Sequence, residues 1–126
     1  MQDHPSALEI LGTVITHLRT KALPGLEGRA LFEMRVTLSA LDLIQRELTL
    51  GPQSDAAEQA RLVALLEQEG DLATLNRALC DAIEAGKLGV DNDALMAHLR
   101  ATAIEKLAVD QPNYSAYRRA TAAKEA

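Results

Sequence analysis

Residues 28–50, Gly-Arg-Ala-Leu-Phe-Glu-Met-Arg-Val-Thr-Leu-Ser-Ala-Leu-Asp-Leu-Ile-Gln-Arg-Glu-Leu-Thr-Leu, decide the fold. At 3.6 residues per turn, their apolar side chains form two arcs on opposite sides of one helix, roughly 34 Å long. The first arc contains Leu31, Met34, Leu38, Leu41 and Leu48, and the second contains Phe32, Val36, Ala40, Leu43 and Leu50. A helix that is apolar on two sides is normally packed between others. We therefore predict a central helix that ends at Gly51-Pro52, with Phe32 and Val36 covered by a neighbouring helix or chain.

Helical patterns also fill the sequence on both sides of this segment. The chain has 22 Ala and 21 Leu among 126 residues, but 5 Val and 5 Ile, a composition typical of helices. Breaks at proline, glycine and capping residues delimit the other expected helices: Pro5–Ala22, Ser54–Gln68, Asp71–Ala85 and Asp93–Val109. The sequence thus predicts an all-α fold, a compact bundle of about five helices over residues 1–110. Residues 111–126 form a tail that we expect to be partly ordered, or to dock on the bundle or on a second subunit.

Charge and cysteine content exclude several classes of function. The net charge is −5 and the pI about 5.1, which disfavours nucleic acid as a partner. No apolar run approaches the roughly 20 residues of a membrane span, so we expect no membrane contact and a cytoplasmic location. Cys80 has no second cysteine to pair with, and we expect it to be a small buried hydrophobe.

No pattern in the sequence indicates a metal, a cofactor or a catalytic centre. No histidine has another at i+4 and no Glu-x-x-His occurs, so the ligand pattern of a bundle di-iron site is missing. His4 and His98 are expected at the surface. His17 lies at the border of the apolar face of the first helix, where it could be a partly buried structural residue, an interface residue or a proton carrier.

A polar ridge on the long helix is the main candidate binding site. Its members Arg35, Ser39, Asp42 and Arg46 are spaced i, i+4, i+7 and i+11, so they line up between the two apolar arcs. Asp42 and Arg46 have the spacing at which opposite charges meet on a helix. The guanidinium of Arg35 could bind a carboxylate or phosphate through two hydrogen bonds. The alternative is a solvated edge with no ligand.

The order of several short motifs resembles a family of short, uncharacterised, all-helical bacterial proteins, a domain of unknown function. The resemblance covers about residues 3–114 and rests on Pro5-Ser6-Ala7, Ala22-Leu23-Pro24, Gly28-Arg29, Phe32 with Arg35-Val36, Arg46-Glu47-Leu48, Gly70-Asp71-Leu72 with Leu75, Leu99-Arg100-Ala101-Thr102 and Lys106-Leu107. Ser39 stands where members tend to have Asn. Members tend to be encoded near acyl-CoA dehydrogenases and near kinases similar to aminoglycoside phosphotransferases. The resemblance implies an accessory role in acyl-CoA or hydroxyacyl metabolism, with a kinase-like or acyl-CoA dehydrogenase-like partner, and it assigns no catalytic residues.

Two functions remain in competition, since the sequence names no reaction. The first is a non-enzymatic interaction module that forms a homodimer, because the first two helices carry more apolar surface than five helices need internally. The second is a small-molecule site, or a minor enzyme, that binds a CoA ester or phosphate at Arg35 and Arg46, with His17 beside it. A third alternative, a nucleic-acid or membrane contact by Arg118, Arg119 and Lys124, conflicts with the acidic remainder of the chain.

Overall fold

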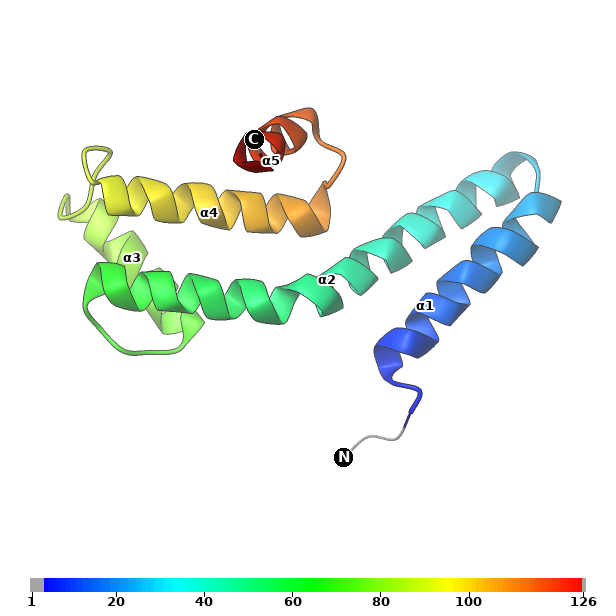
Figure 1. The fold of residues 1–126 in the computed structure, drawn as a ribbon, viewed down its shortest axis with the longest axis horizontal. Coiled ribbons are helices and arrows are strands. Elements are labelled where there is room, and N and C mark those ends of the chain that lie inside the picture. Colours follow the sequence, from blue (N-terminus) through cyan, green and yellow to red (C-terminus); the bar gives the residue numbers. More distant parts are fainter. Residues whose placement is uncertain (1–3, 126) are drawn as a thin grey trace. The chain divides into compact units, whose positions relative to one another are not determined.

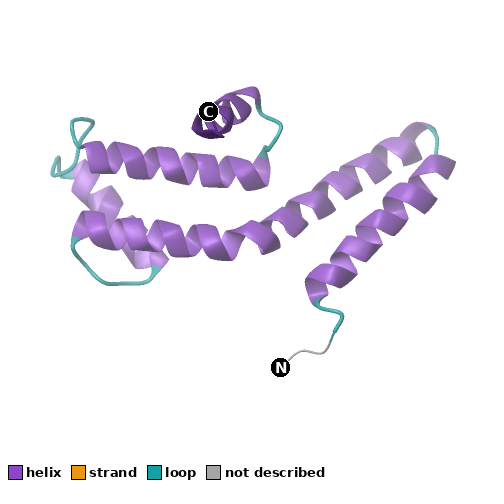
Figure 2. Ribbon diagram, viewed as in Figure 1, coloured by secondary structure: helices purple, strands orange, loops and turns teal. Residues whose placement is uncertain are grey.

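The computed structural model describes residues 4–125, which are helical apart from short connections (Figures 1 and 2). The elements are α1 (Ala7–His17), a π-helical turn η1 (Leu18–Ala22), a 3₁₀ turn η2 (Leu23–Gly25), α2 (Gly28–Leu66), α3 (Leu72–Glu84), α4 (Asp93–Asp110) and α5 (Ser115–Glu125). The predicted all-α class, the long second helix and the short C-terminal helix are confirmed. The chain divides into two compact units, residues 1–50 and 51–126.

The long helix α2 is where the sequence prediction fails most clearly. We expected Gly51-Pro52 to end one helix and Ser54 to cap the next, but α2 runs through all three residues for 39 residues, roughly 58 Å. Pro52 has no N–H to donate to the Leu48 carbonyl, and its ring crowds that carbonyl, yet the helix continues. Leu48 is exposed, so water can bind at this turn. The Gly-Pro pair marks the boundary between the two compact units and not the end of a helix.

In the first unit, α1 and the first half of α2 form a hairpin (Figure 1). Helix α1 begins at Ala7 and not at Pro5, because Ser6 and Glu9 form a capping box: the Ser6 Oγ accepts from the Glu9 N–H at 3.2 Å, and the Glu9 carboxylate accepts from the Ser6 N–H at 2.6 Å. Ile15 and Leu38 are the buried apolar residues of this unit. The second apolar arc of α2 is not enclosed, since Phe32 is 66% and Val36 is 53% exposed, so the expectation that other helices of the chain cover them is wrong.

The second unit has a clear hydrophobic core between α2, α3 and α4. Leu62, Leu75, Leu79 and Leu95 are buried together. As predicted, Asp71 caps α3, where its carboxylate accepts from the Thr74 N–H at 2.7 Å, and this hydrogen bond lowers the pKa of Asp71. Asn92 caps α4. Helix α5 packs against α4, and the division into a 1–110 bundle and a 111–126 tail stays a prediction.

Candidate functional site

Two contacts fix how α1 and α2 meet in the first unit. The Arg19 guanidinium donates from Nη2 to Asp42 Oδ2 at 2.7 Å. At the middle of α1, a Cβ added at Gly12 would lie 3.2 Å from Gln45 Nε2, so the glycine permits a close approach of the two helices. The seam between α1 and α2 is therefore polar on this side, with an ion pair and an amide along it.

The predicted ridge lies beside this seam. Arg35 and Ser39 are exposed, whereas Asp42 and Arg46 are partly buried. The Ser39 hydroxyl donates to the Arg35 carbonyl oxygen at 2.9 Å, so it serves its own helix. Sequence reasoning missed Arg19, which lies in η1 and pairs with Asp42 of α2. This ion pair could be predicted only if the pairing of the two helices were already known, because the partners are 23 positions apart.

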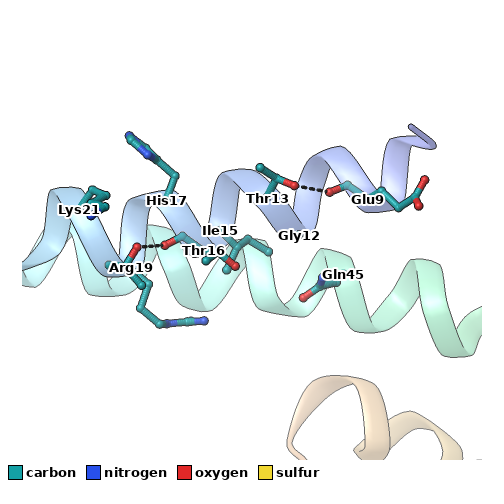
Figure 3. Close-up of a pocket in the computed structure, with 10 residues that line it drawn as sticks. Glu9, Gly12, Thr13, Ile15, Thr16, His17, Arg19, Lys21 and Gln45 are labelled. Carbon is teal, nitrogen blue, oxygen red and sulfur yellow. Dashed lines mark hydrogen bonds between the residues drawn. The ribbon is translucent and has the colours of Figure 1, made fainter. Parts of the chain in front are cut away.

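A shallow polar groove of about 770 Å³ follows α1 on the first unit (Figure 3). Its lining residues include His17, Arg19, Lys21 and Gln45. His17 is exposed, and Figure 3 shows it on the opposite side of α1 from Arg19. The other four predicted site residues are not among the ten that line this groove. Of the predicted site residues, His17 thus lines this groove, and the ridge that sequence reasoning proposed does not.

A second polar cluster lies in the second unit, between α2 and α4. The guanidinium of Arg61 binds both carboxylate oxygens of Glu105, with Nη1–Oε1 at 2.9 Å and Nη2–Oε2 at 2.6 Å, and its Nη2 also donates to Thr102 Oγ1 at 3.2 Å. Both charged side chains are 26% exposed. The hydrogen bonds from Arg61 to Glu105 raise the pKa of Arg61, which keeps it charged. Nearby, Glu58 accepts from the Asn76 amide at 3.0 Å and ties α2 to α3.

His98 belongs to the buried part of the second unit and not to its surface, contrary to our expectation. Only 3% of the residue is exposed, and within residues 4–125 its Nδ1 has no hydrogen-bond partner. Burial lowers the pKa of His98, and the positive charge of Arg61 lowers it further. The signal was present, since His98 follows the buried Leu95 by three residues and shares its face. We expected Cys80 to be buried, and this prediction is wrong, because Cys80 is exposed on α3.

Within the described part of the chain, no cluster of three or more His, Cys, Asp or Glu side chains could hold a metal ion. A search of the same residues for a helix of the length and hydropathy of a membrane span found none. The Arg61–Glu105 ion pair joins α2 to α4. Within residues 4–125, Nε of Arg61 is buried without a hydrogen-bond partner.

A family model described as "Domain of unknown function (DUF6285)" matches residues 24–114. No curated protein and no solved structure matches the chain.

Proposed function

Because the chain belongs to the DUF6285 family, a domain of unknown function, we propose a function from its surfaces: it is a self-associating helical module that forms a homodimer and has no reaction of its own. The proposal agrees with the function that the sequence favoured. It concerns the first unit, where apolar side chains outnumber the positions available inside the hairpin.

The single observation that carries this proposal is the poor burial of the first unit. Ile15 and Leu38 are buried there, whereas six large apolar side chains are between 44% and 66% exposed. These six are Ile10, Val14, Phe32, Val36, Ile44 and Leu48. The second unit buries four leucines in one cluster, although large apolar side chains are exposed there too: Ile83, Val90, Met96, Leu99 and Tyr114.

Two paired helices have a seam but no core, because each helix buries one narrow stripe against the other. Stable helical domains add a further layer that covers the remaining apolar surface. A second copy of the same hairpin supplies such a layer, and closed pairs of identical subunits are the commonest assemblies of soluble proteins. The part of the sequence prediction that this proposal keeps is coverage of exposed apolar surface on the hairpin by a second chain.

The oligomeric state of the purified full chain tests this proposal. We expect the mass of a dimer in light scattering and sedimentation velocity at micromolar concentration, measured with a reducing agent because Cys80 is exposed. A monomer over the whole range from micromolar to submillimolar concentration would refute the proposal.

A second candidate function, binding of an anionic small molecule, is favoured by the groove along α1. Its volume of about 770 Å³ lies in the range of ligand pockets, roughly 300–1,000 Å³, and it presents the cations Arg19 and Lys21. Arg35 and Arg46 lie on the neighbouring helix. A thermal shift with a CoA ester, reduced by Lys21→Ala, is the expected result. If neither the ester nor inorganic phosphate changes the melting temperature, this candidate fails.

The partners implied by the family resemblance remain part of the proposal. They are an acyl-CoA dehydrogenase-like or kinase-like protein, met in the cytoplasm in a pathway of acyl-CoA or hydroxyacyl compounds. Purification of the native protein followed by mass spectrometry of bound proteins tests this part. Recovery of the protein without either class of enzyme would count against it.

A further inference from the structure

The Arg19–Asp42 ion pair shows on which side of the hairpin each apolar side chain lies. Successive helical residues are rotated by about 100°. Val14 comes one residue before the buried Ile15 on α1, and Arg19 lies in the π-helical turn η1 that continues this helix, so the two lie on opposite sides of Ile15. On α2, Ile44 and Asp42 lie on opposite sides of the buried Leu38. Since Arg19 and Asp42 touch at 2.7 Å, the two apolar residues share the other side of the hairpin.

The level of each residue along the hairpin follows from the close approach of Gly12 and Gln45. In an antiparallel pair of helices, moving one residue toward the C-terminus of α1 corresponds to moving one residue toward the N-terminus of α2. Because Gly12 lies beside Gln45, Val14 lies within one residue of the level of Ile44. By the same step, Ile10 lies within one residue of the level of Leu48. These four side chains form one patch across both helices, which we name the hairpin face.

The hairpin face is exposed and apolar. Ile10 is 51%, Val14 44%, Ile44 45% and Leu48 54% exposed. Between the four, toward the seam, lie the partly buried Leu11 and Leu41. None of these six positions carries a charge, whereas the charged residues of the seam lie on its other side.

These features determine which partner suits the hairpin face. A patch without charges meets an identical patch without electrostatic repulsion, and it offers a charged partner no ion pair. The arc of Phe32 and Val36 differs, because it lies on one helix only and borders the ridge of Arg35. The hairpin face, built by two helices, is the surface on which a second hairpin can complete four helices.

Resting on the proposed self-association, the geometry points to the hairpin face as the dimer interface: Ile10, Val14, Ile44 and Leu48 pack against the same residues of a second copy about a two-fold axis. The two hairpins then form a four-helix bundle. In this arrangement the side of each hairpin that carries Arg19 and Asp42 faces away from the partner and stays accessible to ligands.

Charged substitutions on the two sides of α2 test this interface in the full-length protein. Ile44→Glu and Leu48→Glu place a charge in the hairpin face, and Val36→Glu is the matched control, because Val36 is exposed to a similar extent, 53%, on the same helix. We expect each hairpin-face variant to raise the dimer dissociation constant by at least about 30-fold. Val36→Glu should leave it within about threefold, as expected for a residue outside the interface.

Circular dichroism of each variant checks that the helices remain. Should Ile44→Glu or Leu48→Glu lose helix, Val14→Asp on α1 repeats the test from the other helix. If the wild-type protein is a monomer, both the proposed function and this inference fail. If it is a dimer that Val36→Glu dissociates and Ile44→Glu does not, or that none of the substitutions affects, only the hairpin face is wrong.

Discussion

Replacing Glu105 with glutamine removes the negative charge from the Arg61–Glu105 contact and leaves the size of the side chain nearly unchanged. Glutamine keeps the volume of the side chain but can accept through one oxygen only, so one of two short hydrogen bonds and the ion pair are lost. Arg61 then remains charged, partly buried, and close to the core that joins α2 to α4. We therefore expect the second unit to become less stable.

The expected magnitude follows from the burial of the pair. Exposed ion pairs are worth about 0–1 kcal/mol, and removing one partner of a fully buried pair costs about 3–5 kcal/mol. With both side chains 26% exposed, we place the loss for Glu105→Gln between these limits, at about 2 kcal/mol. In a chain of this size that corresponds to a fall in the melting temperature of roughly 8 °C.

Urea unfolding followed by circular dichroism measures this loss, with two companion variants. Thr102→Val removes only the 3.2 Å hydrogen bond to Arg61 Nη2 and should cost about 1 kcal/mol or less. A double-mutant cycle of Glu105→Gln with Arg61→Met isolates the pair itself, and the double variant should lose less than the two single losses together. The reasoning is refuted if Glu105→Gln unfolds within about 0.5 kcal/mol of the parent protein, the range of an ordinary surface change.

Three further predictions concern individual positions. Burial lowers the pKa of His98 in the folded protein, so the unfolded chain binds a proton at this residue more readily than the folded chain does. The contribution of His98 to the free energy of unfolding should therefore be constant above the ordinary histidine pKa of about 6.5. It should fall as the pH drops below that value. His98→Leu should flatten this part of a pH–stability profile, and an unchanged slope would contradict the assignment. Gly12→Ala should stabilise α1 by up to about 1 kcal/mol, because the flexible end of the Gln45 side chain can turn away; a lower melting temperature would show that it cannot. Asp71→Ala should cost about 1 kcal/mol through loss of the cap on Thr74, and Asp71→Asn, which still caps, should restore most of it.

Local signals in the sequence predicted the ends of a helix correctly where no tertiary contact overrides them. Asp71 caps α3, and Gly86, with φ at +72°, lies just beyond its end as expected. Gly51-Pro52 was misread because a proline breaks one hydrogen bond but does not stop a helix whose turns on both sides remain well formed.

Burial could be predicted less well than helicity. A wheel places His98 near the apolar stripe of α4 but does not say how far that stripe is covered, which depends on α2 and α3. The same holds for Val36, whose arc was expected inside the molecule and lies outside it. The Arg19–Asp42 and Arg61–Glu105 pairs join residues far apart in sequence, so no periodicity in one helix could reveal them.

The exposed thiol of Cys80 has a practical consequence for work on this protein. As the sole cysteine of the chain, it accepts one maleimide dye or spin label per molecule without any substitution. In air, two such thiols can also join covalently, and the linked species would have twice the mass of the chain whether or not its helices associate.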